Sequence, residues 1–397
     1  MVDYLIVGGG IAGLYTAYKL EQMGKTYLLF EASNRLGGRL YQYKWYNIDV
    51  NLGAALVRPR DSILLDLCKT LKLQLIEHPP AVDYRFCPEA GKIRPLVKEI
   101  YKVYEEKKDE ILAMKLSFQQ FLYQYFSPAD AEIIIRGFQY TDFLHAGVYE
   151  TIYWYPLSDI LPEKSFTIKG GWNALINSLL EHIDKKRIFL KHPVEKIKYE
   201  KNILYANNVA TGGIIFATTK PAIQKIAMPE SIAQSLSFLD IDIGTVPFTK
   251  IFTYHNSKLQ KINGMVVTSS MPQRIVRITD HIMLAVYADE DFARYWKTWY
   301  RKIGEKDNIG KDLNTRDLKI HLHKVLEKLF PNLPEIDDLL YKYWDTGVHY
   351  WTAENSTRIP LDKYAHPHKN ILVCGEMLSK NQGWCEGALE SVNRLRL

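Results

Sequence analysis

Three glycines near the start of the chain have the spacing of a phosphate-binding loop. The stretch GGGIAG places Gly8, Gly10 and Gly13 in a G-x-G-x-x-G pattern. The first glycine permits a tight turn, the second lets a pyrophosphate approach the backbone, and the third lets the following helix pack closely. Glu31 follows at a distance that suits a carboxylate accepting hydrogen bonds from ribose hydroxyls. These residue types predict a dinucleotide-binding site.

The elements that must position these residues are readable on either side of the loop. Val2–Val7 is an apolar run that predicts a buried parallel strand. Ile11–Met23 has helical spacing of apolar residues, and Gly24 suits the position just after a helix. Tyr27–Phe30 predicts a second strand that ends at Glu31. The glycine motif therefore lies in the strand–helix–strand setting that it requires.

A second glycine pair follows the predicted second strand. Gly37 and Gly38 precede Arg39, whose guanidinium can add positive charge to a pyrophosphate site or simply lie in solvent. The pattern E-x(6)-G-R, from Glu31 to Arg39, resembles that of the FAD-binding amine oxidase superfamily. This superfamily includes monoamine oxidases, polyamine oxidases and related histone demethylases. Further stretches continue the resemblance, among them DVNLGAALVR, FTIKGGWNALI and the final VCGEMLSKNQGWCEGALE.

The resemblance implies a set of FAD contacts that is strongest at the two ends of the chain. Asn51 departs from it, because the family usually has an acid at that position, and Val194 is equally readable as an ordinary strand residue. The last helix, expected to begin at Gly387, would point its N-terminus at the flavin ring. The implied cofactor-binding residues are Gly8, Gly10, Ile11, Ala12, Gly13, Glu31, Ala32, Gly38, Arg39, Leu40, Gly53, Ala54, Leu56, Val194, Gly375, Glu376, Trp384 and Gly387.

The resemblance also implies catalytic positions. Lys250 lies in an otherwise apolar strand pattern, where the family places a lysine that bonds through water to flavin N5; the alternative is a lysine that reaches solvent. The family's pair of rings facing the flavin corresponds to His349 and Trp384, with Tyr350 as the alternative to His349. A histidine is an unusual member of such a pair, so the substrate preference stays open among monoamines, polyamines and amino acids.

The implied reaction is hydride transfer from an amine α-carbon to flavin N5, giving an imine or aldehyde, with hydrogen peroxide formed from O2. Some members attach FAD through a cysteine; Val348 stands at that place, so noncovalent FAD is expected. Two other functions stay open. A flavin-dependent sugar mutase would need paired arginines, for which Arg274 and Arg277 are candidates, and a non-catalytic flavoprotein would serve as a binding module.

The implied fold is α/β, with a Rossmann-type FAD-binding domain interleaved with an α+β substrate-binding domain. The FAD-binding domain is expected at residues 1–78, 155–240 and 345–397, and the substrate-binding domain at 79–154 and 241–344. Helices are expected at 62–76 with Ser62 as cap, at 97–125, at 128–145 and at 315–330, and an irregular segment at 149–162. The first and last segments of the chain are expected to meet around one cofactor.

Composition narrows the class of protein. A chain of 397 residues with 47% hydrophobic residues and a net charge of +6 is ordinary for a two-domain globular protein without a nucleic-acid partner. The four cysteines form no CxxC pair and no metal-ligand spacing, so no metal is expected. No signal peptide, membrane span or membrane anchor is indicated, which favours a cytoplasmic location. The partners expected are a small-molecule amine and O2; the oligomeric state stays open, a homodimer included.

Overall fold

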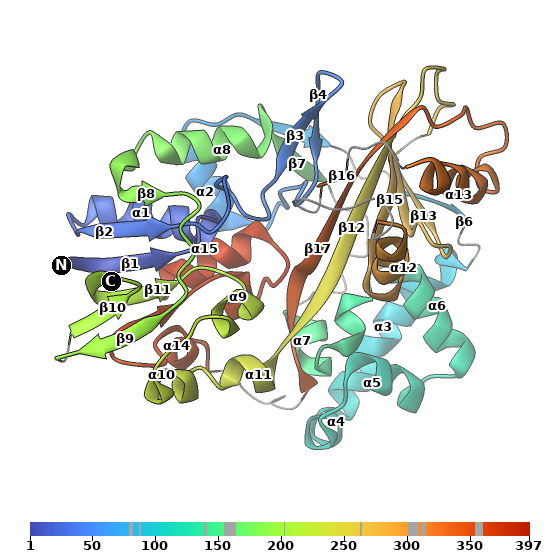
Figure 1. Ribbon diagram of the computed structural model, residues 1–397. Coiled ribbons are helices and arrows are strands. Elements are labelled where there is room, and N and C mark those ends of the chain that lie inside the picture. The colour runs from blue at the N-terminus through green and yellow to red at the C-terminus, as the bar shows by residue number, and fades with distance from the viewer. Residues whose placement is uncertain are drawn as a thin grey trace. The chain divides into compact units, whose positions relative to one another are not determined.

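Segments that are far apart in the sequence assemble into two structural units. The computed structural model describes residues 1–78, 82–86, 89–138, 141–154, 164–201, 203–262, 264–300, 309–310, 315–353 and 360–397 (Figure 1). Unit 1 contains residues 1–78, 164–244 and 358–397, and unit 2 contains residues 79–163 and 245–357. Each unit has its own sheet and its own core, so each is described separately.

Unit 1 is built on a largely parallel sheet with the order β8-β2-β1-β11-β10-β9, in which β18 also pairs with β11. The strands β8, β2, β1, β11 and β18 are parallel, and β10 is antiparallel to both β11 and β9. Its elements are β1 (Val2–Val7), α1 (Ile11–Gln22), β2 (Tyr27–Phe30), β3 (Gln42–Trp45), β4 (Ile48–Asn51), α2 (Ser62–Thr70), β5 (Leu75–His78), β7 (Ser165–Ile168), α8 (Gly171–Leu180), η3 (Lys185–Arg187), β8 (Ile188–Phe189), β9 (Ile197–Glu200), β10 (Ile203–Ala206), β11 (Val209–Phe216), α9 (Lys220–Gln224), α10 (Glu230–Ser235), α11 (Phe238–Asp242), α14 (Leu361–Ala365), β18 (Ile371–Val373), η5 (Glu376–Leu378) and α15 (Cys385–Asn393).

The predicted strand–helix–strand start of the chain is confirmed. β1 and β2 have the expected bounds, and α1 ends one residue before Met23. Gly24 has a φ of 66°, the left-handed conformation that favours glycine after a helix. α1 packs its apolar face on the sheet, where Leu14 shares one core with Ile6 of β1.

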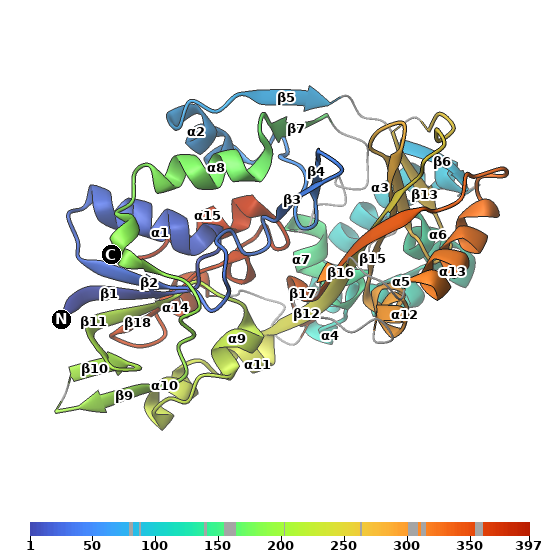
Figure 2. The ribbon, with the colours of Figure 1, turned by 45° about the horizontal axis from the view of Figure 1, so that its top comes forward.

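The first and last segments of the chain meet inside unit 1, as expected. β11 pairs with β1 on one side and with β18 on the other. α1 and α15 lie side by side in both views (Figures 1 and 2), and Lys19 of α1 donates to Asn393 of α15 across 2.8 Å. Leu389 and Val392 of α15 belong to the same core as α1. One layer of helices thus joins residues from both ends of the chain.

Unit 2 contains a mostly antiparallel sheet with the order β16-β17-β12-β15-β14-β13-β6, so it is an α+β unit. Among its described residues, α12 and α13 pack on the sheet through Trp296 and Leu322, and the helices from α3 to α7 form a separate cluster. Its elements are β6 (Val82–Phe86), α3 (Ala90–Glu106), α4 (Lys108–Met114), α5 (Phe118–Tyr125), α6 (Pro128–Phe138), η1 (Asp142–His145), α7 (Val148–Tyr153), β12 (Ile243–Tyr254, which starts at the end of unit 1), β13 (Met265–Thr268), β14 (Arg274–Arg277), β15 (Ile282–Asp289), α12 (Glu290–Tyr300), β16 (Ile309–Gly310), α13 (Arg316–Glu327) and β17 (Asp338–Trp351).

Several predicted elements differ from the observed ones. The helix expected at 62–76 ends at Thr70, because Lys72 has a φ of 56° and the chain then forms β5, which pairs with β7. Asp61, not Ser62, occupies the N-cap position of α2. The helix expected at 97–125 is instead the three helices α3, α4 and α5, the first of which begins at Ala90. The segment expected to be irregular starts with the helix α7, and residues 155–163 lie outside the described part of the chain.

The unit boundaries also differ from the expected domain boundaries. The chain returns to unit 1 at residues 164 and 358, later than the expected 155 and 345. The physical reason at the second boundary is that residues 338–351 form one continuous strand, β17, beside β12 in the sheet of unit 2. Among the described residues, no helix combines the length and apolar character needed to cross a membrane. The same residues hold no group of three or more side chains suited to a metal ion.

Candidate functional site

The glycine loop between β1 and α1 is shaped so closely that side chains could not replace its hydrogens. Gly8 has a φ of +111°, and a Cβ added to it would lie 2.6 Å from the carbonyl oxygen of Ala217. A Cβ on Gly13 would lie 1.9 Å from the carbonyl oxygen of Gly8. Gly10, in an extended conformation, is the N-cap of α1, with no side chain to cap the helix. Both Gly8 and Gly13 are therefore required by the local packing.

The start of α1 offers hydrogen-bond donors to an anion. Ile11 and Ala12 form its first turn together with Gly13, which contains no acidic residue, and no side chain caps the helix. The first N–H groups of a helix lack intrahelical partners, and the helix dipole places partial positive charge at this end. The donors, the missing Cβ atoms and the absence of a competing carboxylate in this turn fit the pyrophosphate of a dinucleotide.

Glu31 holds the glycine loop from the end of β2. One carboxylate oxygen accepts a hydrogen bond from the N–H of Gly9 at 2.7 Å, and the other accepts from the N–H of Ser33 at 2.8 Å. A carboxylate has about four acceptor positions, so further donors such as ribose hydroxyls can still be accommodated. Ala32 lies between Glu31 and Ser33 in this turn. The acid is thus fixed next to the loop that the sequence paired it with.

The glycine pair Gly37 and Gly38 packs against the glycine loop between β1 and α1. Gly37 donates its N–H to the carbonyl of Gly9 at 2.8 Å, and Gly38 has a φ of +56°. A Cβ on Gly53 would lie 1.9 Å from the carbonyl of Arg39, so this glycine is also required by a close backbone approach. Leu40, by contrast, is buried in the core of unit 1.

Arg39 forms an ion pair with Glu376, which joins the two ends of the chain at the site. The Arg39 side chain is 27% exposed and that of Glu376 only 6% exposed. The other carboxylate oxygen of Glu376 accepts from the N–H of Gly383 at 3.2 Å. Gly375 precedes this acid with a φ of +127°. Arg39 is therefore not simply a solvated loop arginine.

Other predicted cofactor residues have varied surroundings. The carbonyl of Ala54 accepts a hydrogen bond from the indole of Trp172 at 2.8 Å. Leu56 is 42% exposed. Val194 is buried but lies in a loop before β9 rather than in a strand. None of these three shares a hydrogen bond with the glycine loop in the described part of the chain.

The start of α15 is packed against residues 58–64. α15 begins at Cys385, not at Gly387, and a Cβ on Gly387 would lie 2.2 Å from the carbonyl of Asn381. Glu386 accepts hydrogen bonds from the N–H groups of Ile63 and Leu64 at 3.0 and 2.9 Å, so its carboxylate satisfies the start of α2. Burial raises the pKa of Glu386, and these two hydrogen bonds act in the opposite direction.

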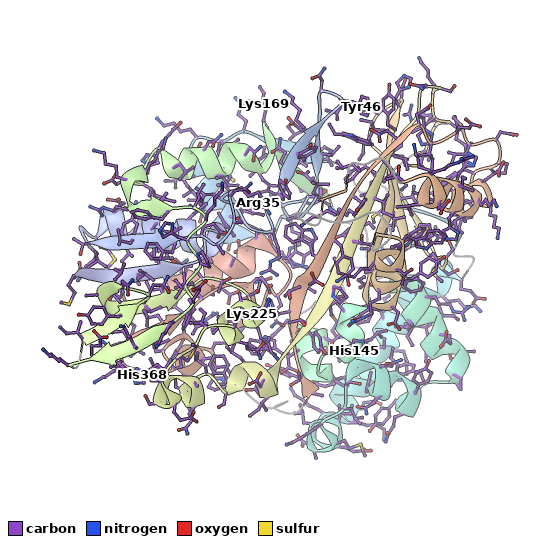
Figure 3. All side chains as sticks on the ribbon, in the orientation of Figure 1. Arg35, Tyr46, His145, Lys169, Lys225 and His368 are labelled. Carbon is purple, nitrogen blue, oxygen red and sulfur yellow. The ribbon has the colours of Figure 1, made fainter. Side chains whose placement is uncertain are left out.

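Trp384 is the N-cap residue of α15 and is partly buried. The guanidinium carbon of Arg58 lies 3.9 Å from the centroid of its ring. Sequence reasoning missed Arg58, although an arginine at the end of an apolar run was a visible signal. It also missed Arg35, labelled in Figure 3, which donates to the carbonyl of Gly38 at 2.8 Å and covers the ring of Tyr41.

Lys250 lies in β12 of unit 2 and is 4% exposed. It pairs in register with Tyr287 of β15, and its Nζ lies 4.6 Å from the centroid of that ring. Burial lowers the pKa of Lys250 from 10.5 to about 7. The alternative of a lysine that reaches solvent is thus wrong, and the amine can change protonation near neutral pH.

His349 and Tyr350 are neighbours in β17 of unit 2. Successive side chains of a strand point to opposite faces, so only one of the two can occupy a given site. His349 is 2% exposed, and the ring of Tyr350 lies 5.9 Å from that of His145. Burial raises the pKa of Tyr350. Lys250, His349 and Tyr350 therefore belong to unit 2, and Trp384 belongs with the glycine loop to unit 1.

The arginines that a sugar mutase would need do not form a pair. Arg274 is buried, and burial lowers its pKa to about 10. Arg277, on the same strand, forms an ion pair with Asp280, whose side chain is 51% exposed. Arg274 is thus interior, whereas the Arg277 side chain is 22% exposed and pairs with Asp280, which does not favour the mutase.

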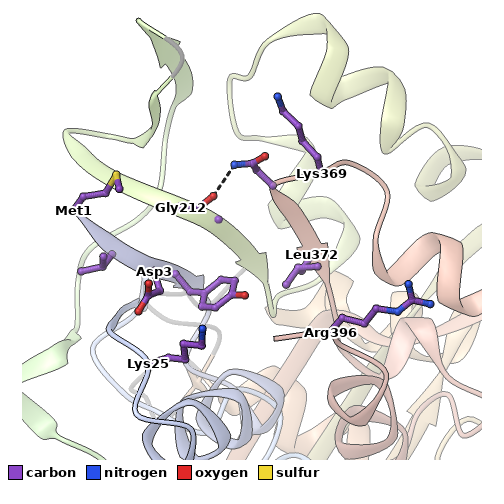
Figure 4. Close-up of a pocket in the computed structure, with 11 residues that line it drawn as sticks. Met1, Asp3, Lys25, Gly212, Lys369, Leu372 and Arg396 are labelled. Atoms are coloured by element: carbon purple, nitrogen blue, oxygen red, sulfur yellow. Dashed lines mark hydrogen bonds between the residues drawn. The ribbon is translucent and has the colours of Figure 1, made fainter.

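A cavity of about 320 Å³ lies in unit 1 near the amino-terminal ends of β1, β11 and β18 (Figure 4). It is lined by Met1 and Asp3 at the start of β1, and by Lys25, Lys369 and Arg396. In Figure 4 the ends of the three cationic side chains point in different directions. Dinucleotides bind at the carboxyl ends of parallel strands, where the glycine loop lies, so this cavity is not part of the candidate site.

Comparison with known proteins agrees with this geometry. The chain is 24% identical over 456 aligned residues to an L-amino-acid oxidase of Crotalus adamanteus, covering 98% of this chain and 84% of that protein. It is 43% identical over 75 residues to flavin-containing amine oxidase A of Sus scrofa, but this match covers only 19% of this chain and 14% of that protein. A solved structure of putrescine oxidase shares the fold, with a TM-score of 0.74 and 16% identity over 99% of this chain and 97% of that one. The model of the flavin-containing amine oxidoreductase family matches residues 11–218. The chain therefore belongs to the family of flavin-containing amine oxidoreductases, which are flavin-dependent oxidoreductases of CH–NH groups.

Proposed function

We propose that this protein is an FAD-dependent amine oxidase that converts a small amine to an imine or aldehyde and O2 to hydrogen peroxide. The observation that carries the proposal is the glycine loop at the uncapped start of α1, held by Glu31, in a chain of this family. The proposal covers the reaction and the class of substrate. Monoamines, polyamines and amino acids all fall within that class.

We assign the two ends of unit 1 to the cofactor. The N–H groups at the start of α1 would bind the pyrophosphate, Glu31 would accept hydrogen bonds from ribose, and the Arg39–Glu376 pair would lie along the remaining chain of the cofactor. When bound, the flavin would supply the two-electron chemistry that side chains lack. Val348 stands where some family members carry an attaching cysteine, which supports noncovalent binding.

Lys250 is proposed to hold and release a proton beside the reacting atoms. An amine with a pKa of about 7 exists in both protonation states at neutral pH, so it can donate a hydrogen bond in one and accept a proton in the other. Burial in β12 keeps bulk solvent away from this amine. Lys250 would thereby orient a water molecule and assist the oxygen step.

Trp384 of unit 1 and one residue of β17 in unit 2 are each proposed as a contact of the substrate amine. An indole face excludes water and positions an apolar carbon chain. His349, at 2% exposure, is the candidate residue in β17, with Tyr350 as its alternative. Their contribution is to keep the site dry and the amine oriented. A cytoplasmic location is proposed as well, supported by buried free thiols at Cys68, Cys374 and Cys385.

The test begins with the absorption spectrum of the purified protein. We expect a yellow protein whose flavin band bleaches on anaerobic mixing with one class in a panel of monoamines, diamines and amino acids. The flavin should leave the protein on acid precipitation, as noncovalent binding requires. Air should then restore the band and produce peroxide, and Lys250→Met should slow this reoxidation. A colourless protein that does not take up FAD would refute the proposal.

A further inference from the structure

The indole of Trp384 has a cation against one of its faces. The guanidinium carbon of Arg58 lies 3.9 Å from the ring centroid, which is close contact for a stacked cation. Arg58 is only 5% exposed. Among the described residues, Arg58 is the one cationic or aromatic side chain in contact with that ring. The two faces of the indole are therefore chemically different.

Arg58 is held in place by contacts that fix its plane. Its Nε donates to Asp61 at 2.8 Å, and its Nη2 lies 2.7 Å from the same carboxylate oxygen. Nη2 also donates to the side-chain oxygen of Asn381 at 3.0 Å. The backbone is fixed too, because Pro59 restricts Arg58 and Val57 pairs with Phe166. A guanidinium with this many partners cannot rotate freely under the ring.

The backbone that carries Trp384 is fixed independently. Trp384 donates its N–H to the carbonyl of Asn381 at 3.3 Å, and the amide of Asn381 donates to Glu390 at 3.1 Å. Glu386 ties the first turn of α15 to the start of α2. Because the backbone is anchored and one ring face is covered, the direction of the opposite face is determined by Arg58.

A cation on one face changes what the other face prefers. The π cloud of an indole attracts a cation, but a guanidinium already stacked on it uses part of that attraction. A second cation on the opposite face would also be repelled by the first. Asp61 offsets this repulsion only in part, because it lies beside the guanidinium and not against the ring. A neutral amine does not meet this repulsion.

We infer that Arg58 is a positioning and specificity-determining residue: it sets the plane of Trp384 and makes the opposite indole face favour uncharged ligands over cations. This inference rests on the proposed function, because it takes that face as the one toward the substrate. It accounts for selection of the neutral amine, the form with a lone pair and a reactive α-carbon. It also assigns a role to a buried cation that the sequence did not single out.

The test compares two ligands that differ only in charge. Choline and 3,3-dimethylbutan-1-ol have the same shape, with N⁺ in one and carbon in the other. Their dissociation constants for the FAD-loaded protein are measured by perturbation of the flavin spectrum, without turnover. The wild type should bind the alcohol at least as tightly as choline. Failure of both compounds to bind the wild type would overturn the inference, because the face would then take no ligand of this size.

Variants separate charge from shape. Arg58→Met should shift the ratio of the two dissociation constants toward choline roughly tenfold. Arg58→Lys keeps the charge, so the ratio should stay near that of the wild type while both ligands bind more weakly. Asp61→Asn should shift the ratio in the opposite direction, because it removes the offsetting anion. If Arg58→Met does not fold, Arg58→Gln with Asp61→Asn leaves no unpaired buried charge and should still shift the ratio toward choline.

An unchanged ratio in a variant with normal FAD content and near-ultraviolet circular dichroism overturns the inference. The outcome is distinguishable from failure of the proposed function. If amines bleach the flavin but the ratio does not respond to Arg58, only the inference fails. If the ratio responds but no amine bleaches the flavin, the proposed oxidase activity fails and the role of Arg58 in ligand choice stands.

Discussion

Replacing Lys250 with methionine should make the protein more stable, by an amount that depends on pH. Lys250 is buried in β12 with a pKa lowered from 10.5 to about 7. Each pKa unit corresponds to about 1.36 kcal/mol, so burial of this lysine costs about 5 kcal/mol of folding free energy at and below pH 7. Methionine has a similar length and no charge, so Lys250→Met removes this cost.

The direction of the pH dependence follows from the protons bound in each state. Between pH 7 and 10.5 the unfolded chain keeps the proton of this lysine and the folded protein releases it. The stability of the wild type therefore rises with pH across this interval, and falls as pH drops toward 7. The variant lacks this contribution. Its advantage in unfolding free energy should therefore shrink by about 3 kcal/mol between pH 7 and pH 9.5.

The assay is urea unfolding of the FAD-loaded wild type and variant at several pH values in this interval, followed by tryptophan fluorescence. Subtraction of the two curves cancels the other titrating groups, which both proteins share. Lys258→Met, at a lysine whose side chain is 76% exposed, is the control, and its effect should be small and should not follow this course. A Lys250→Met advantage that stays constant with pH would refute the reasoning.

Three further predictions concern a glycine and two acids. Gly13→Ala should lower the unfolding free energy by about 1–3 kcal/mol, since its Cβ would meet the carbonyl of Gly8, and should weaken FAD binding in a fluorescence titration. Glu31→Gln should weaken FAD binding roughly tenfold in the same titration, because the charged acceptor beside Gly9 is lost. Glu150→Gln should become more stable relative to the wild type as pH rises from 5 to 8 in urea unfolding, by about 2.5 kcal/mol, because burial raises the pKa of Glu150 to about 7.

Matched controls exist for these three substitutions. Gly91→Ala, in α3 with open space at its Cβ, should be neutral or stabilising. Glu200→Gln and Glu99→Gln replace acids whose side chains are 53% and 50% exposed. Normal FAD affinity in Gly13→Ala or in Glu31→Gln would contradict the proposed binding of FAD by the glycine loop and Glu31. A stability difference for Glu150→Gln that does not change with pH would contradict its assigned pKa.

The sequence by itself determined the strand–helix–strand structure at the start of the chain and the dinucleotide-binding groups that this structure carries. The bounds of β1 and β2 were predicted because a buried strand and a glycine turn leave a local pattern. Gly8 and Gly13 were identified by the spacing of the glycine motif, and the structure shows that a side chain at either position would collide with nearby backbone. Lys250 stood out because a charge inside an apolar strand needs an explanation.

Only the tertiary structure decided which distant segments pair with one another. Nothing local indicates that residues 338–351 continue as one strand of unit 2, or that the chain turns at Lys72 to form β5. These outcomes depend on pairing with strands that lie elsewhere in the sequence.

The contact of Arg58 with Trp384 and the capping of α2 by Glu386 likewise join residues that are adjacent only after folding. Sequence pattern reports the conformation that each segment prefers and the groups that it carries. Which group faces which is determined by long-range packing, because the energies that decide it come from contacts between segments.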